Sequence, residues 1–462
     1  MSIHSKTQTM RSINPFTNQT DRTWQDHTEP EVRQIIDDVA RAWQLWRRTS
    51  FKERADYLLR LESQLLADQH KLAAVMVAEM GKINREALAE IEKCARVCRY
   101  YAENGAGFLR NDPVKTEASE SYVSFQPLGT ILAVMPWNFP FWQVFRFLAP
   151  ALMAGNTAVL KHASNVTGCS LAIEETVRKA GLPENVFRSL LIGGKEVEQV
   201  IQHPHIKAVT LTGSTPAGKS VAAAAGVLLK KTVLELGGSD PYLILADAAI
   251  DEAAKLCVTS RLLNAGQSCI SAKRFIVLEP VYEQFRDAFL RSMLEVKYGD
   301  PTDGETGIGP LARHDLRDDL HKQVKSSEEK GAKILCGGFI PEHEAAFYPP
   351  TILENVKPGM PAWEEELFGP VAALIKAGTE EDAIRIANDT VFGLGAAIFT
   401  SDISKGKELA EKGLDAGCVF VNDFVRSDPR LPFGGVKDSG YGRELAVFGI
   451  REFVNIKTVV VK

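Results

Sequence analysis

The stretch 205–238, HIKAVTLTGSTPAGKSVAAAAGVLLKKTVLELGG, decides the fold class. It opens with an apolar, β-branched run over 205–212, which predicts a strand. The glycine-flanked turn 213–218 and an alanine-rich helical stretch follow, and a second apolar run covers 232–236. Strand, glycine turn, helix and strand in this order predict a parallel sheet covered by helices.

The same alternation continues on both sides of this stretch. Apolar patterns predict helices over 83–103, 170–180, 250–264 and 281–296, and strands over 186–192, 242–245 and 274–278. We therefore expect an α/β fold with helices on both faces of parallel sheets.

Composition narrows the function classes. The 462 residues suggest about two to four domains. The formal charge of −5 gives no general attraction to nucleic acid or to an anionic membrane. The apolar stretch 128–160 contains Arg146 and three prolines, so it does not read as a membrane span. The polar segment 1–14 does not resemble a signal peptide.

Cysteine and histidine usage predicts a reducing compartment and no metal. The seven cysteines are odd in number and show no paired spacing, which favours a cytoplasmic location. Cys94 and Cys98 share a helix face, and His203 and His205 lie in a turn, but no further ligands complete a metal site.

Cys269 is the candidate nucleophile, and Glu235 is the candidate base. Cys269 follows Asn-Ala-Gly-Gln-Ser in a polar loop, where a thiol can be exposed and can ionise. The alternative for Cys269 is an inert loop cysteine. Glu235 ends an apolar strand, where partial desolvation would raise the pKa of its carboxyl towards the working range. The alternative for Glu235 is a strand-edge side chain that faces solvent.

Three further segments suggest an oxyanion site and a cofactor site. Asn138, between Pro136 and Pro140, could donate its amide to an oxyanion, or could simply hydrogen-bond within its own turn. The turn 213–218 precedes a helix whose free N–H groups could bind a pyrophosphate, although it is not a full G-x-G-x-x-G motif. Lys161 ends a strand and could reach ribose hydroxyls, or could be a solvated side chain.

In this order, the segments resemble the aldehyde dehydrogenase superfamily along essentially the whole chain. Each match is weak by itself, but the ordered set is specific. The matches are Pro-Trp-Asn138-Phe-Pro, Lys161, the Gly213-Ser turn, Leu-Glu235-Leu-Gly-Gly, Gly-Gln-x-Cys269, Glu366-Leu-Phe368-Gly-Pro, Val-Asn422 and Pro432-Phe-Gly-Gly-x-Lys437-x-Ser-Gly.

The resemblance implies a catalytic role for three of these residues. Cys269 would attack an aldehyde and form a covalent thioester after hydride transfer to a nicotinamide. Asn138 and the Cys269 backbone N–H would hold the oxyanion, and Glu235 would activate the water that hydrolyses the thioester. A nicotinamide-free thiol hydrolase is the competing class, but no histidine motif accompanies the cysteine.

The resemblance also implies the cofactor contacts. Glu366 would hold the nicotinamide ribose, and Phe368 would pack near the ring. Ser214, in the turn that Gly213 begins, would meet the pyrophosphate, with Trp137 close by.

The family architecture implies three domains. A Rossmann-type cofactor domain would cover 1–107 and 128–234, and an α/β catalytic domain 235–448. A β-arm of 108–127 with 449–462 would join subunits into a homodimer or homotetramer, because its alternating apolar pattern suits strands that pair with another chain.

Within the superfamily, the chain resembles bacterial succinate-semialdehyde dehydrogenases. That resemblance implies an aldehyde substrate with a distal carboxylate, held by Arg146 and Ser427. Succinate semialdehyde is the expected substrate, and glutarate semialdehyde is the alternative. For Arg146 an internal ion pair is the structural alternative.

Two departures from the family pattern concern the cofactor. The usual Lys-Pro-Ser/Ala-Glu reads Lys161-His-Ala-Ser164, so the acid that would bind the adenosine ribose is absent. The usual glutamate of the phosphate turn is Pro216. We therefore expect NADP to be accepted and preferred, with NAD as the other possible cofactor.

Overall fold

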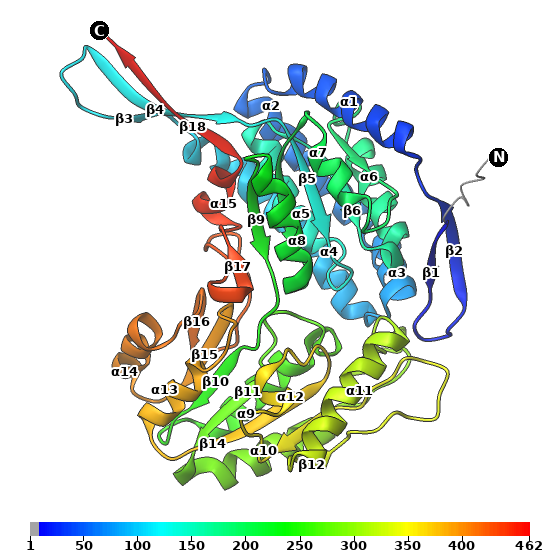
Figure 1. Ribbon diagram of the computed structural model, residues 1–462, viewed down its shortest axis with the longest axis vertical. Helices are drawn as coiled ribbons and strands as arrows, with labels where there is room; N and C mark the ends of the chain where they lie inside the picture. Colours follow the sequence, from blue (N-terminus) through cyan, green and yellow to red (C-terminus); the bar gives the residue numbers. More distant parts are fainter. Residues whose placement is uncertain (1–8) are drawn as a thin grey trace.

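The computed structural model describes residues 9–462, so the first eight residues of the predicted segment 1–107 lie outside the described part. Two large parallel sheets form the body, and a three-stranded arm projects from it (Figure 1). The predicted α/β class is confirmed by these sheets and their covering helices.

A six-stranded sheet contains the strand–turn–helix stretch from which the fold was predicted. Its order is β17-β9-β8-β5-β6-β7, and β17 alone runs antiparallel to its neighbour. The strands are β5 (Thr130–Met135), β6 (Thr157–His162), β7 (Phe187–Ser189), β8 (Ile206–Thr212), β9 (Lys231–Glu235) and β17 (Gly440–Tyr441).

Helices cover both faces of this sheet because successive residues of its strands point to opposite sides. In β5, Leu132 packs with one group of helices, whereas Ile131 and Ala133 pack with the other. The first group is α1 (Glu29–Trp46), α7 (Val197–Gln202) and α8 (Thr215–Val227). The second is α2 (Phe51–Ala67), α3 (Gln69–Met80), α4 (Asn84–Phe108), α5 (Trp142–Ala154) and α6 (Thr167–Lys179).

A seven-stranded sheet lies in the other half of the body, with the order β12-β13-β14-β11-β10-β15-β16 and only β12 antiparallel. The strands are β10 (Pro241–Ile244), β11 (Arg274–Leu278), β12 (Lys333–Cys336), β13 (Thr351–Glu354), β14 (Val371–Ala377), β15 (Gly395–Phe399) and β16 (Cys418–Val421). Its helices are α9 (Ile250–Leu262), α10 (Tyr282–Leu294), α11 (His314–Glu329), α12 (Pro361–Glu364), α13 (Glu380–Asn388) and α14 (Ile403–Glu408).

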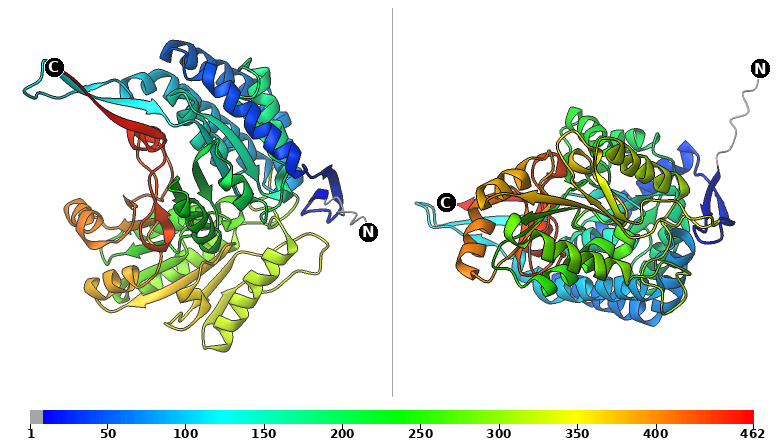
Figure 2. Two further views of the ribbon diagram at one scale, coloured as in Figure 1. Left: turned by 45° about the horizontal axis from the view of Figure 1, so that its top comes forward. Right: turned by 90° about the horizontal axis from the view of Figure 1, so that it is seen from below.

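The arm is formed by segments from two distant parts of the chain. β18 (Val454–Val461) pairs antiparallel with β4 (Glu120–Pro127) along its whole length, and β3 (Asp112–Pro113) adds to the other edge. Both long strands extend away from the body (Figure 2). A hairpin of β1 (Thr9–Ile13) and β2 (Thr20–Gln25) lies on the other side of the molecule from the arm, where β1 contacts α3 and α6.

The C-terminal segment connects three of the four sheets formed by residues 9–462. β16 is an edge strand of the seven-stranded sheet, and β17 is an edge strand of the six-stranded sheet. β18 follows α15 (Ala446–Glu452) and belongs to the arm. β17 lies inside the predicted catalytic segment 235–448, yet it pairs with the sheet of the predicted cofactor segment. A single cut in the sequence at residue 235 therefore does not separate the two sheets.

The predicted elements are present with shifted ends. The helix expected over 83–103 is α4, which continues to Phe108. The helix expected over 250–264 ends at Leu262. Asn264 (φ 56°) and Ala265 (φ 53°) then take left-handed backbone conformations, which end the helix and begin the loop that carries Cys269.

Candidate active site

One cavity of about 270 Å³ brings together most of the predicted site residues. Its walls come from the segment after β5, the β8–α8 turn, the segment after β9, the cysteine loop and the segment after α12. The predicted residues on its walls are Trp137, Asn138, Gly213, Ser214, Cys269, Glu366 and Phe368. The carboxyl ends of β5, β8 and β9 thus meet the cysteine loop at one edge of the six-stranded sheet, where α/β folds commonly bind ligands.

The cysteine loop is fixed by buried amides. Asn264 donates its side-chain amide to the carbonyls of Asn138 (2.7 Å) and Gln267 (3.1 Å). A Cβ at Gly266 would collide with the backbone of Gly369, so only glycine fits at that position. These contacts connect the loop before Cys269 directly to the segment that carries Asn138.

The side-chain amide of Asn138 is held by one hydrogen bond and keeps a second hydrogen available for a ligand. It is 4% exposed, and its Nδ2 donates to the Gln267 carbonyl at 3.1 Å. An amide nitrogen carries two hydrogens, so the second can be donated to an oxygen in the cavity. This arrangement can perform the predicted oxyanion role, which stays a prediction.

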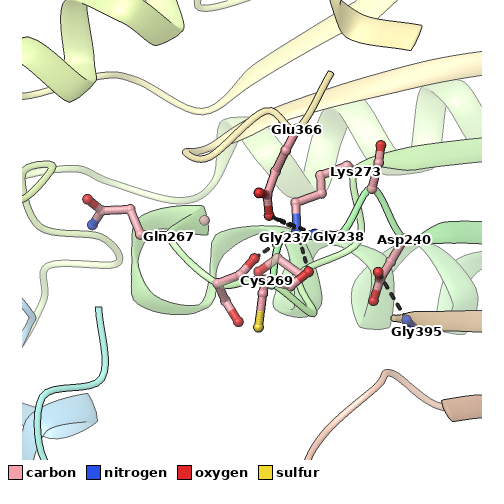
Figure 3. A network of polar contacts seen from close by, with 12 residues as sticks. Gly237, Gly238, Asp240, Gln267, Cys269, Lys273, Glu366 and Gly395 are labelled. Carbon is pink, nitrogen blue, oxygen red and sulfur yellow. Dashed lines mark hydrogen bonds and ion pairs between the residues drawn. The ribbon is translucent and has the colours of Figure 1, made fainter. Parts of the chain in front are cut away.

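Lys273 and Glu366 hold the backbone on the other side of Cys269 (Figure 3). The Lys273 ammonium donates to the carbonyls of Cys269 (2.6 Å) and Ser268 (2.9 Å) and lies 3.2 Å from Glu366 Oε1. Glu366 also accepts from the Gly238 N–H at 3.2 Å. Lys273 therefore links the nucleophile loop to the carboxylate expected to hold the nicotinamide ribose.

The Cys269 thiol is more shielded than the polar loop suggests. Burial raises its pKa to about 12, while the positive charges of Lys273 and Arg146 act in the opposite direction. The thiol is therefore protonated in this arrangement, and attack on an aldehyde requires a proton acceptor.

Glu235 is fully desolvated and does not lie on the wall of the 270 Å³ cavity. Burial, and next the nearby Glu444, raise the pKa of its carboxyl well above the usual range. Neither carboxyl oxygen has a hydrogen-bond partner among residues 9–462. The shift goes in the predicted direction. A raised pKa favours the protonated carboxyl, which must lose its proton before Glu235 can act as a base.

Arg146 forms the internal ion pair that was the structural alternative. Its side chain is 2% exposed, pairs with Glu444 and donates to Thr212 Oγ1 at 3.3 Å. The guanidinium also lies over the Phe433 ring at 4.8 Å. Since a guanidinium has five N–H groups, this pairing leaves donors for a further anion, and the substrate role of Arg146 stays a prediction.

Ser427 is hydrogen-bonded to a lysine. Its hydroxyl accepts from the ammonium of Lys93 on α4 at 2.8 Å. The residue is buried in the loop after β16, and its predicted contact with substrate is likewise untested.

The start of α8 fits a dinucleotide pyrophosphate. Ser214 is the N-cap, its side chain makes no capping hydrogen bond, and the first turn has no acidic residue. The free N–H groups and the positive end of the helix dipole are therefore available to an anion. Trp137 and Phe368 meet edge to face at 5.7 Å between ring centroids, which gives an apolar wall suited to a nicotinamide ring.

Lys161 and Ser164 lie on a second cavity, of about 570 Å³. Ser164 is exposed there, and Lys161 is 9% exposed with its pKa lowered by burial. His162 between them adds no charge, because burial lowers its pKa to about 4 and its ring faces the Pro140 carbonyl at 2.8 Å. Arg11 and Arg313 also line this cavity.

The sequence patterns did not predict two side chains of the site. The only sequence feature that marks Lys273 is its place immediately before an apolar strand. Glu444 had none, since its importance comes from packing beside Glu235 and Arg146, which are far away in sequence.

Within residues 9–462, no group of three or more histidine, cysteine, aspartate or glutamate side chains is placed to bind a metal ion. Over the same range, none of the helices combines the length and the apolar character needed to cross a bilayer.

The cavity and the two sheets together define a class. One cavity combines a thiol, an amide with a spare hydrogen and a helix start that can accept a pyrophosphate, and this set suits a nicotinamide-dependent oxidoreductase that works through a thiol. The family model described as "Aldehyde dehydrogenase family" matches residues 3–459. The chain belongs to the aldehyde dehydrogenase family, which confirms the predicted fold and the NAD(P)-dependent oxidoreductase class.

Close relatives cover nearly the whole chain. A "Probable succinate-semialdehyde dehydrogenase (NADP+)" of Synechocystis is 49% identical over 448 residues, 97% of this chain and 98% of the relative. "Succinate-semialdehyde dehydrogenase (NADP+) 1" of Mycobacterium tuberculosis is 47% identical over 451 residues, with 97% and 98% covered. The crystal structure of succinic semialdehyde dehydrogenase from Streptococcus pyogenes with NADP+ superposes with a TM-score of 0.96 at 38% identity, covering 98% of this chain and 99% of that one.

Proposed function

We propose that this protein oxidises succinate semialdehyde to succinate and uses NADP as hydride acceptor. The observation that carries the proposal is the shared cavity of Cys269, Asn138 and the α8 N-terminus. The names of relatives that are 47–49% identical support the choice of substrate and cofactor.

The chemistry follows from the placement of three side chains. The Cys269 thiol loses its proton to solvent as its sulfur adds to the aldehyde carbon, and the spare Asn138 amide hydrogen stabilises the oxygen that becomes negative. A nicotinamide held by the α8 N-terminus, Glu366 and Phe368 would supply the hydride acceptor that this oxidation needs, and the acyl group would then remain on the Cys269 sulfur as a thioester. Glu235, once deprotonated, takes a proton from water, whose oxygen attacks the thioester and releases the acid and the free thiol.

We propose that Arg146 and Ser427 recognise the distal carboxylate. Arg146 is on α5, eight residues after Asn138, and its charge already influences the Cys269 thiol. Ser427 follows β16 and supplies a hydroxyl. A planar guanidinium suits a carboxylate, and this supports an ω-carboxylated aldehyde over a neutral one.

The NADP preference is supported by the second cavity. Ser164 has no negative charge that would repel a 2′-phosphate, and Lys161, Arg11 and Arg313 provide positive charge around it. The one carboxylate on the cavity wall, Asp315, is paired with Arg313 at 2.6 Å.

Replacing Ser164 with glutamate is expected to lower kcat/KM for NADP about tenfold or more, because the new charge would face the 2′-phosphate. The value for NAD should stay similar or improve. Ser164→Gln is the matched control, since it adds the same bulk without charge. Initial rates with both cofactors check the ratio; an unchanged NADP/NAD ratio in Ser164→Glu would show that this residue does not set the preference.

The substrate proposal is tested by initial rates with succinate semialdehyde, glutarate semialdehyde and butyraldehyde, each with NADP and NAD. We expect the highest kcat/KM for succinate semialdehyde with NADP. A neutral aldehyde used as well as the semialdehydes would contradict the substrate proposal.

We further propose the three-domain division given by the sequence, assembly as a homodimer or homotetramer, and a cytoplasmic location. β18 supports assembly, because no strand within residues 9–462 pairs with its outer edge and it exposes Ile456 and Val460. Seven free cysteines support a reducing compartment.

A further inference from the structure

Lys93 is a cation without a counter-ion among residues 9–462. It lies on α4 and is half-buried, and among residues 9–462 no carboxylate comes within ion-pair distance of its ammonium. Its hydrogen bond goes to the neutral hydroxyl of Ser427 at 2.8 Å. A shielded ammonium with no anion is costly, so the position calls for a ligand that supplies one.

The placement of Lys93 is fixed by the contact between α4 and α5. One turn earlier on α4, Glu90 pairs with Lys82 and accepts from the backbone N–H groups of Phe141 and Trp142, both at 2.9 Å. Glu90 thereby locks the first turn of α5 against α4. Lys93 then lies over the Trp142 ring, 4.2 Å from its centroid.

The same packing brings Lys93 close to Arg146. Trp142 and Arg146 are four residues apart on α5 and so share a face. Burial lowers the pKa of Lys93 to about 8, and the positive charge of Arg146 is the next largest cause. The two cations therefore repel each other across a shielded space, and the carboxylate of Glu444 is committed to Arg146 alone.

The nearby carboxylates do not neutralise Lys93. Asp428, next to Ser427, is paired with Arg430 through two contacts of 2.9 and 2.6 Å. Glu90 is held by Lys82 and by the start of α5. An anion that enters between α4, α5 and the loop after β16 would meet Lys93 and the Ser427 hydroxyl together.

We propose that Lys93 binds the distal carboxylate of the substrate and is the principal determinant of specificity for ω-carboxylated aldehydes. The inference rests on the proposed oxidation of succinate semialdehyde and assigns its carboxylate to a residue on α4. Arg146, with its charge largely compensated by Glu444, orients the carboxylate from the α5 side. Ser427 positions the Lys93 ammonium and accepts its hydrogen bond until substrate arrives.

The test compares Lys93→Met and Lys93→Arg with the wild type on succinate semialdehyde and butyraldehyde, which share chain length and differ in the carboxylate. For Lys93→Met we expect kcat/KM with succinate semialdehyde to fall about ten- to a hundredfold through KM. The kcat value and all constants for butyraldehyde should change less than about threefold. Lys93→Arg should recover most of the loss, because it restores a positive charge.

Arg96→Met is the matched control, because Arg96 is on the same helix, is exposed and points to Glu92. It removes one positive charge outside the site and should leave both aldehydes unaffected. Lys93→Gln serves as a second neutral variant, with thermal melting of each protein as the check of folding.

The outcomes separate the two proposals. Equal losses for both aldehydes, or no loss for succinate semialdehyde, would overturn the role of Lys93. A wild type that shows no preference for succinate semialdehyde over butyraldehyde would instead overturn the substrate proposal. In that case the ratio of kcat/KM for succinate semialdehyde between Lys93→Met and wild type still reports whether Lys93 contacts the carboxylate.

Discussion

Replacing Cys269 with serine is expected to reduce aldehyde oxidation on the order of a thousandfold or more. An alcohol is a much weaker nucleophile than a thiol, and the burial that raises the thiol pKa to about 12 would disfavour an alkoxide still more. Fold and cofactor binding should survive, because sulfur and oxygen differ little in size and the loop is held by Asn264 and Lys273 rather than by the thiol.

Formation of reduced nicotinamide measures turnover in this variant, and quenching of protein fluorescence by NADP measures cofactor binding. Cys336→Ser is the matched control, since Cys336 is a half-buried thiol on the edge strand β12 of the other sheet. Turnover retained in Cys269→Ser would rule out a thioester on this residue.

Replacing Glu235 with glutamine is expected to slow thioester hydrolysis by about 10²- to 10⁴-fold, the usual contribution of a general base. Addition and hydride transfer should continue once, so a burst of about one reduced cofactor per subunit should precede a slow steady rate. Rapid-mixing absorbance measures the burst, and mass spectrometry of the denatured protein should find the acyl group on Cys269.

The raised pKa of Glu235 also fixes the pH dependence of hydrolysis. The deprotonated carboxyl is the active form, so a pKa above its usual range means that the wild-type hydrolysis rate increases as pH rises towards that value. The increase should disappear in Glu235→Gln. Steady turnover equal to wild type, with no burst, would show that another group activates water.

Local patterns were sufficient to predict much of this architecture. The run into Gly213 and the alanine-rich stretch behind it predicted β8 and α8, because strand and helix preferences are read over a few residues. Cys269 and Asn138 stood out for the same reason, since glycine and proline beside them mark unusual backbone. The structure places both on one cavity wall.

The remaining features depend on contacts between distant segments. Part of the rise in the Glu235 pKa comes from the charge of Glu444, more than 200 residues later, and the neighbours of Glu235 in sequence give no sign of it. The ion pair of Arg146 has the same origin. Lys93 is a lone lysine in an amphipathic helix, a pattern typical of a solvated side chain, and only the packing of α4 on α5 gives it another meaning.

The path of the C-terminal segment through three sheets has a consequence for synthesis on the ribosome. Glu444, which lies between β17 and β18, is translated more than 200 residues after Glu235, at about 5–20 residues per second. A nascent chain can already bury most of both large sheets, yet Arg146 lacks its ion-pair partner and Glu235 its charged neighbour until the segment after β17 emerges. Premature termination after β16 would thus release a chain that has Cys269 but lacks Glu444 beside Arg146 and Glu235. We expect such unfinished copies to oxidise aldehydes poorly.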